Sequence, residues 1–244
     1  MAEPGYKLDH VACGVRRIAE VAPYLEGVLG ARPYRGGPNP DFNGRQWSFA
    51  NGALLEIIEP AGAEGGFLHR FLDMRGPGIH HVTFKVPDIY AARARAEAAG
   101  YTVVGFNDAY PSWKECFLHP KQAQGIVVQF AENHPELSSE DSWHEFAPVV
   151  PAPATPALSL LGVRMVTHDL GRSRAQWVEL LGAEVVEESA GQLLVRWEGC
   201  PLHVRLLLQA AAEQGPQGLE TAVPPKFAAT LEAFAPLGAR LIPV

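Results

Sequence analysis

Two histidines and two residues with oxygen-bearing side chains occur at matched spacing in the first half of the sequence. His10 precedes Glu56 by 46 residues, and His81 precedes Gln129 by 48. Each of the four lies in a short apolar segment typical of a β-strand. Imidazole nitrogens and carboxylate or amide oxygens that converge on one point suit a divalent first-row metal ion, with positions left for a substrate. The pattern therefore predicts one metal site.

These positions belong to an internal repeat. Three segments align, and they begin at Leu8, Ile79 and Leu161. Each reads as a strand, an amphipathic helix, a glycine and a second strand, with the helices predicted over residues 17–29, 88–99 and 169–181. Further strands follow, ending in ALLEIIEP, GIVVQFAE and HVRLLLQA. The repeating unit is β-α-β-β-β, so we predict an α+β protein of tandem βαβββ modules.

The alternation of side chains along a strand decides which histidine of GIHHVTFKV faces the site. His80 shares a face with the continuous apolar residues of that strand, which are expected to pack against the helix or at its rim. His81 lies on the opposite face, and His10 is its counterpart in the first repeat. The corresponding residues of the third repeat are predicted to be Gly162 and Leu206, which have no metal-binding side chain.

Composition and charge exclude several classes of protein. The net charge of the 244-residue chain is −7 with no basic stripe, which argues against a nucleic-acid partner. No apolar run reaches about 18 residues, so no membrane span is expected. The N-terminus lacks a signal-peptide pattern, and three scattered cysteines favour a reducing compartment. We therefore expect a cytoplasmic monomer or homodimer that binds a small-molecule substrate.

Three segments resemble the vicinal-oxygen-chelate superfamily, which includes glyoxalases, bleomycin-resistance proteins and dioxygenases. They are LDHVA, GIHHV and FLHPKQAQGIVVQF, and within the superfamily they are most similar to methylmalonyl-CoA epimerase-like proteins. The resemblance covers residues 6–132 and implies two modules placed edge to edge, whose curved sheet forms a cleft. The family's metal ligands fall on His10, Glu56, His81 and Gln129. The resemblance implies one divalent ion, which is Co, Mn, Ni, Fe or Zn.

The resemblance also implies that the metal stabilises an enolate while a base removes a proton next to a carbonyl group. The epimerases carry a catalytic glutamate on the strand GRQWSFAN, where the alignment places Trp47. Glyoxalase I enzymes use the fourth metal ligand as a base, and here Gln129 cannot accept a proton. Substitutes lie in or just before SWKECFLHP, and they are Glu115, Lys114 and Tyr110. Only one of Glu115 and Lys114 can face the cleft.

We therefore predict a metal-dependent isomerase, epimerase or lyase that acts on a small carbonyl or carboxylate substrate, with a CoA thioester as one option. A ligand-binding or sequestering protein of the same fold remains an alternative. A metal-dependent hydrolase or dioxygenase remains another. The full ligand set favours an enzyme, whereas the missing bases weaken the case for either named reaction.

The second half of the chain is predicted to keep the architecture without the metal. Residues 133–157 read as a Pro/Ala-rich linker, with Trp143 and Phe146 anchoring it on a domain surface. Residues 158–244 read as a degenerate module pair that lacks metal ligands. Its last module is incomplete, with a helix near residues 225–234.

Overall fold

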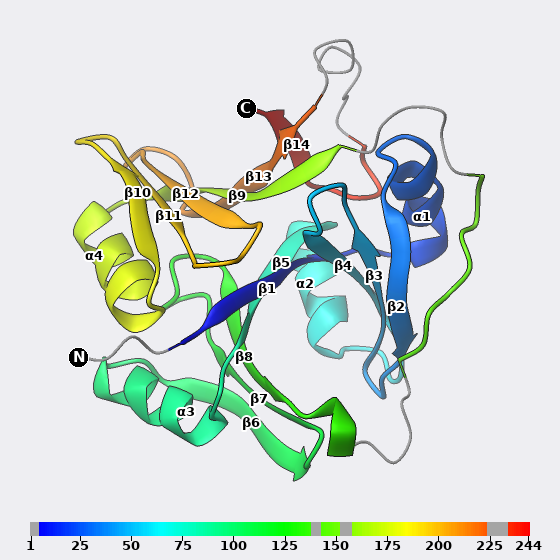
Figure 1. The fold of residues 1–244 in the computed structure, drawn as a ribbon, viewed down its shortest axis with the longest axis horizontal. Coiled ribbons are helices and arrows are strands. Elements are labelled where there is room, and N and C mark those ends of the chain that lie inside the picture. The colour runs from blue at the N-terminus through cyan, green and yellow to red at the C-terminus, as the bar shows by residue number, and fades with distance from the viewer. Residues whose placement is uncertain (1–4, 138–142, 152–157, 224–233) are drawn as a thin grey trace. The chain divides into compact units, whose positions relative to one another are not determined.

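The computed structural model describes residues 5–137, 143–151, 158–223 and 234–244. Within these ranges the chain repeats one βαβββ arrangement (Figure 1). The first module consists of β1 (Lys7–Gly14), α1 (Ile18–Gly27), β2 (Arg32–Pro38), β3 (Phe42–Ser48) and β4 (Leu54–Pro60). An additional helix, α2 (Phe67–Arg75), follows it.

The later modules have the same order of elements. The second consists of β5 (Gly78–Lys85), α3 (Ile89–Ala98), β6 (Val103–Tyr110), β7 (Trp113–Leu118) and β8 (Val127–Asn133), and the short 3-10 helix η1 (Pro135–Leu137) follows it. The third consists of β9 (Ser159–Thr167), α4 (Leu170–Arg174), the π-helix η2 (Ala175–Leu180), β10 (Glu184–Glu188), β11 (Gln192–Arg196) and β12 (His203–Leu208). The described strands of the fourth are β13 (Gly215–Ala222) and β14 (Arg240–Pro243).

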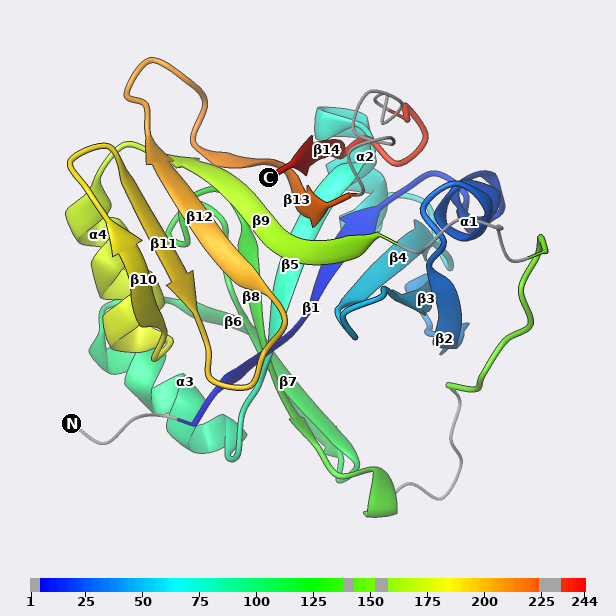
Figure 2. The ribbon, with the colours of Figure 1, turned by 45° about the horizontal axis from the view of Figure 1, so that its top comes forward.

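Strand order is the same in each complete module. The orders are β2-β3-β4-β1, β6-β7-β8-β5 and β10-β11-β12-β9, the last of which can be followed in Figure 2. The first strand of each module pairs in parallel with the last, and the other neighbours pair antiparallel. Strands β13 and β14 form the same kind of parallel pair. In the three complete modules, the parallel pairing brings together residues that lie more than 40 positions apart in the sequence. In the first two modules it brings the proposed metal ligands onto neighbouring strands.

Contacts divide the chain into two compact units. The first-module unit comprises His10–His80, Asp141–Leu161 and Gly218–Val244. The second-module unit comprises Met1–Asp9, His81–Glu140 and Gly162–Gln217, and so contains the second and third modules. Each unit is described below by itself.

The core of the first-module unit lies between α1 and one face of its strands. Apolar residues of the two facing surfaces are fully buried, among them Val11, Val21, Leu25 and Leu55. The carboxylate of Glu59 accepts a hydrogen bond from the N–H of Ile18 at 2.6 Å and so binds the N-terminus of α1. Helix α2 packs Leu68 and Leu72 against Ile58 on β4.

The second-module unit joins its two modules through aromatic rings and a buried polar network. Phe84 of β5 contacts Trp197 with ring centroids 4.9 Å apart. The side chain of Gln124 accepts hydrogen bonds from Ser173 at 2.7 Å and Thr167 at 3.1 Å, and it donates one to Gln176 at 3.2 Å. Because Gln124 precedes β8 and its three partners belong to the third module, this network ties the modules together.

The structure confirms the α+β class and the tandem βαβββ modules. The predicted helices are present in slightly shorter form, and α1 continues through Pro23. Helix α2 and the π-helical turn were not predicted from the sequence. The helix expected near residues 225–234 falls almost wholly outside the described residues. The division into a module pair at 6–132, a linker and a second pair stays a prediction.

The described part of the chain contains no helix that is both long enough and apolar enough to cross a membrane. The three cysteines are all free thiols. Burial raises the pKa of Cys13 to about 12, and burial also raises that of Cys116 to about 12. Both thiols are therefore protonated near neutral pH and are poor nucleophiles.

Candidate functional site

His10 and Glu56 meet in the first-module unit because β1 and β4 are parallel neighbours. Glu56 pairs with Ala12, two residues beyond His10, so both side chains project from the same face. The Nε2 atom of His10 lies 3.1 Å from Oε2 of Glu56, and the two residues are 3% and 5% exposed. The sequence prediction that this pair shares one face is confirmed.

Gln46 completes this half of the site. It pairs directly with Glu56 across β3 and β4, and its Nε2 lies 3.5 Å from Nδ1 of His10. A neutral imidazole with its proton on Nε2 satisfies both contacts, because Nε2 then donates to Glu56 while Nδ1 accepts from Gln46. A buried imidazole beside a buried carboxylate is a donor set that suits a divalent first-row ion.

His81 and Gln129 occupy the equivalent positions of the second-module unit. Gln129 pairs with Thr83, two residues beyond His81, which repeats the register of the first module. Both His81 and Gln129 are 8% exposed. The hydroxyl of Thr83 donates to Oε1 of Gln129 at 2.6 Å, whereas Ala12 stands at that place in the first module. A carbonyl oxygen has two lone pairs, so this contact leaves one for another partner.

Glu115 lies on the same face of the second-module unit. Its Oε2 accepts hydrogen bonds from Nε2 of Gln129 at 2.8 Å and from Nε1 of Trp113 at 2.9 Å. The ammonium group of Lys85 lies 4.0 Å from the centre of the Trp113 ring, a cation–π arrangement. This face of the module therefore presents a carboxylate next to the proposed ligand Gln129.

Lys114 and Tyr110, the other two predicted catalytic residues, do not lie beside Gln129. Lys114 points to the opposite face of β7, where Nζ donates to Glu132 at 2.6 Å. This ion pair raises the pKa of Lys114 and keeps the side chain charged. Tyr110 is 64% exposed at the end of β6. Strand parity thus separates Glu115 from Lys114, as expected for adjacent residues.

The prediction that Trp47 occupies the ligand-facing position of β3 is wrong. The indole of Trp47 is fully buried and donates to Oε1 of Glu26, a residue of α1, at 3.0 Å. Gln46 faces His10 instead, and Gly44 is the next residue on that face. The alignment was off by one residue, which exchanges the two faces of a strand.

The common frame of the closing strands, Glu59 with Glu132, is confirmed. Both carboxylates bind the first turn of their module's helix, since Glu132 accepts from the N–H of Ile89 at 2.8 Å as Glu59 does from Ile18. Both therefore face the helix rather than the four proposed ligands. The ring of His80 packs against Phe71 of α2 with centroids 4.8 Å apart, so its contact is with the additional helix and not with the predicted module helix.

The third module departs from the first two at the ligand positions. Gly162 pairs with His203, and Arg164 pairs with Arg205. In the first two modules, the proposed ligand on the last strand pairs with the residue two positions beyond the histidine on the first strand. Arg164 lies two positions beyond Gly162, so its partner Arg205 is the structural equivalent of Glu56. Leu206, which the sequence alignment indicated, is fully buried on the opposite face.

Gly162 also has an unusual backbone. Its φ angle is 152°, and a Cβ added there would lie 1.9 Å from the carbonyl oxygen of His203. The backbone of β12 thus occupies the space in which the first two modules carry a histidine.

Comparisons with known proteins agree with this architecture. Residues 9–117 match the sequence profile of the Glyoxalase/Bleomycin resistance protein/Dioxygenase superfamily. An ethylmalonyl-CoA/methylmalonyl-CoA epimerase from Cereibacter sphaeroides is 32% identical over 132 residues, which cover 52% of this chain and 97% of that protein. The chain belongs to this superfamily.

Two solved structures resemble this chain over more than its first two modules. A hypothetical protein from Staphylococcus aureus superposes with a TM-score of 0.63 at 12% identity, covering 98% of this chain and 99% of that one. A variant of 4-hydroxymandelate synthase from Streptomyces coelicolor superposes with a TM-score of 0.58 at 18% identity, covering 89% of this chain and 71% of that one. These two likenesses concern the fold alone.

Two residues of the site were not found from the sequence. Gln46 was missed because the register of β3 was misread by one residue. Thr83 was read only as part of a strand face, although its parity with His81 was a usable signal. A hydroxyl between two proposed ligands on one face is the kind of residue that fixes a ligand's orientation.

Proposed function

We propose that this chain is a metal-dependent epimerase, or a closely related isomerase, of an acyl-CoA thioester that carries an acidic proton on its α-carbon. The observation that carries the proposal is the matched pair of buried half-sites, His10 with Glu56 and His81 with Gln129, combined with the likeness to a CoA-thioester epimerase. Each half-site supplies one imidazole nitrogen and one side-chain oxygen.

The four residues would bind one divalent ion, with Co, Mn, Ni, Fe and Zn all compatible with the donor set. Gln46 supports this role of His10, because rotation of its amide can present the oxygen to Nδ1–H when Nε2 is a metal ligand. Thr83 fixes the amide of Gln129 in a similar way. When bound, the ion would act as a Lewis acid that stabilises the negative charge developing on the thioester oxygen.

Glu115 is the proposed base. The hydrogen bonds from Trp113 and Gln129 both reach Oε2 of Glu115, so Oε1 is the oxygen that can accept a proton. The α-carbon's C–H bond would break with its electron pair moving into the carbonyl group, and the proton would transfer to Glu115. Return of a proton to the opposite face of that carbon would complete epimerisation. Lys114 and Tyr110 are weaker candidates, since one is paired with Glu132 on the helix side and the other is exposed.

A binding protein of the same fold is the second candidate. The observation that favours it is the ligand-facing surface of β3, where Gln46 and Gly44 offer no carboxylate as a second proton carrier. A single base can exchange a proton without inverting the carbon. The test must therefore separate exchange, inversion and simple binding.

The experiment combines metal analysis with proton exchange. Purified protein, loaded with each candidate metal, is incubated in D₂O with methylmalonyl-CoA and ethylmalonyl-CoA, and deuterium at the α-carbon is followed by NMR. Metal-dependent exchange together with racemisation of a single epimer supports the proposal. Thioester binding without exchange overturns it in favour of the binding protein. Product formation without deuterium uptake also overturns it.

A further inference from the structure

We infer that Trp143 is a specificity-determining residue, which packs against the alkyl group on the α-carbon of the substrate. This inference rests on the proposed function. Trp143 lies in the segment that follows the second module along the chain, outside every βαβββ repeat. Its main chain and side chain nevertheless contact the first module, within the first-module unit.

The indole occupies the space above Gly44. A Cβ added to Gly44 would lie 2.8 Å and 2.9 Å from two carbons of the Trp143 ring, and 3.1 Å from Oε1 of Glu56. Gly44 is not among the residues with positive φ, so space rather than backbone conformation requires a glycine here. The ring of Trp143 and the carboxylate of Glu56 therefore approach the same point on the ligand-facing surface of β3.

Hydrogen bonds attach the main chain of Trp143 and His144 to β2. His144 and Gly36 of β2 exchange two backbone hydrogen bonds, at 2.9 Å and 3.0 Å, which extend the sheet by one antiparallel bridge. The guanidinium of Arg35 donates to the carbonyl oxygen of Trp143 at 3.1 Å. These contacts place the main chain of Trp143 beside β2, so the ring can reach across to β3.

The rest of the segment is anchored on the helix side of the first module. The buried carboxylate of Glu26 accepts from the N–H groups of Val149 at 2.6 Å and Val150 at 3.2 Å. Phe146 packs on Trp47 with ring centroids 5.1 Å apart. Residues 143–150 are thus held on the first module by backbone and aromatic contacts. The contacts of Trp143 and Phe146 agree with the expectation that they anchor this part of the chain.

The first and second modules differ at the position of Gly44, and the difference suggests that Trp143 contacts the substrate. Gly44 pairs with Ile58, two residues beyond Glu56, and Glu115 pairs with Ala131, two residues beyond Gln129. Gly44 and Glu115 are therefore equivalent. One module presents a carboxylate and the other an aromatic ring supplied from elsewhere in the chain. The ring offers an apolar surface that suits an alkyl group and no atom that could move a proton from carbon.

The test compares Trp143→Ala with the wild type and with Phe146→Ala. For each protein, kcat/KM and the Kd measured by calorimetry are determined for CoA thioesters of malonates with methyl, ethyl and butyl substituents. Because one methylene in an apolar pocket is worth about 10–200-fold in discrimination, Trp143→Ala should shift the butyl-to-methyl ratio about tenfold or more towards butyl. Phe146→Ala removes an anchor without touching Gly44 and should leave the ratio near that of the wild type.

Gly44→Ala provides an independent perturbation of the same contact. The added methyl group overlaps the indole and should displace it, so this variant should shift the ratio in the same direction as Trp143→Ala. The double variant should resemble Trp143→Ala alone, since the clashing ring is then gone. Metal content and thermal unfolding are measured for each variant to show that site and fold persist.

The outcomes separate this inference from the proposed function. An active wild type whose ratio is unchanged by Trp143→Ala overturns the inference and leaves the proposed function standing. A wild type that exchanges no thioester overturns the proposed function and the inference with it. A selective shift in both kcat/KM and Kd supports both.

Discussion

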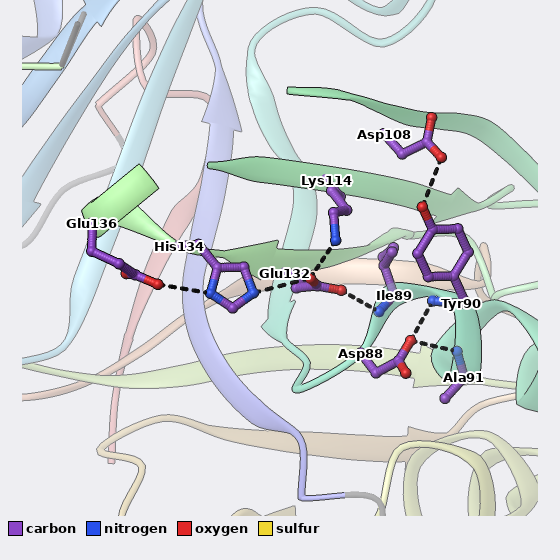
Figure 3. A network of polar contacts seen from close by, with 9 residues as sticks. All are labelled: Asp88, Ile89, Tyr90, Ala91, Asp108, Lys114, Glu132, His134 and Glu136. Carbon is purple, nitrogen blue, oxygen red and sulfur yellow. Dashed lines mark hydrogen bonds and ion pairs between the residues drawn. The ribbon is translucent and has the colours of Figure 1, made fainter. Parts of the chain in front are cut away.

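Glu132→Gln removes a buried negative charge on which three donors converge. Oε1 of Glu132 accepts from Nζ of Lys114 at 2.6 Å and from Nε2 of His134 at 3.0 Å, and Oε2 accepts from the N–H of Ile89 at 2.8 Å (Figure 3). The glutamate side chain is 8% exposed. Glutamine has nearly the same shape, but its NH₂ group must then face a donor.

The expected cost follows from these contacts. A hydrogen bond to a charged group contributes about 1.5–3 kcal/mol, and an unsatisfied buried donor costs about 1–3 kcal/mol. Because the side chain of Lys114 is 21% exposed, water can replace part of the hydrogen bonding that its ammonium group loses in the variant. We expect a net decrease in the free energy of unfolding of about 2–4 kcal/mol. For a chain of this length, each kcal/mol lowers Tm by about 2–4 °C.

The repeat supplies a matched control in Glu59→Gln. Glu59 binds the N-terminus of α1 as Glu132 binds that of α3, but its second hydrogen bond comes from the neutral amide of Asn43 at 3.1 Å. The control therefore loses contacts to neutral donors only. Its destabilisation should be smaller than that of Glu132→Gln.

The pH dependence gives the sharper test. Burial acts to raise the pKa of Glu132, but the hydrogen bonds from Lys114, Ile89 and His134 outweigh it and hold the pKa below its ordinary value. A carboxylate with a lowered folded-state pKa contributes stability that is present above its unfolded pKa of about 4.3 and is lost as the pH falls through the folded-state value. Glutamine does not titrate, so the difference between wild type and variant should shrink below about pH 4.

The assay is denaturant unfolding of wild type and both variants from pH 7 down to pH 3. A difference between wild type and Glu132→Gln that stays constant over this range would refute the electrostatic argument. Equal destabilisation by the two variants would show that the contacts of Lys114 and His134 add nothing beyond the helix cap that the two modules share.

Five further substitutions test the site and the fold. His81→Ala should remove the metal measured by elemental analysis, whereas His80→Ala should retain it; full occupancy in the His81 variant would contradict the proposed ligand set. Glu115→Gln should lower the rate of α-proton exchange about 10²–10⁴-fold with metal content unchanged, and an unaltered rate would exclude it as the base. Thr83→Val should weaken metal affinity about 10–100-fold, measured by competition with a chelator, because Gln129 loses the hydroxyl that orients it. Gln124→Leu removes hydrogen bonds to Ser173, Thr167 and Gln176, and at about 1 kcal/mol for each bond it should lower the free energy of unfolding by about 3 kcal/mol, which calorimetry would detect as a lower Tm.

The features that the sequence predicted correctly follow from local rules. Alternation along β1 and β5 assigned His10 and His81 to one face and His80 to the other, and the repeat related the closing strands through Glu59 and Glu132. Each of these inferences needs only the residues of one strand and a count along the chain. The parallel pairing of first and last strands then supplied the approach of His10 to Glu56.

The features that were missed depend on register or on distant contacts. The errors at Trp47 and Leu206 are one-residue slips, and a slip of one residue reverses the face of every side chain in a strand. Neither strand contains a turn or cap that fixes its register from the sequence alone. Trp143 is a different case, because a segment without periodicity gives no signal of the strand on which it rests.

The geometry at Gly162 limits which residues this position can hold. A counterpart of His10 in the third module would need a histidine here, but its Cβ would lie 1.9 Å from the carbonyl oxygen of His203. The φ angle of 152° would strain any residue other than glycine there. A histidine here would need a prior shift of β12 against β9, which would disturb Arg164 and Arg205 as well. A single substitution therefore cannot give this repeat a histidine at the position that His10 and His81 occupy in the other two.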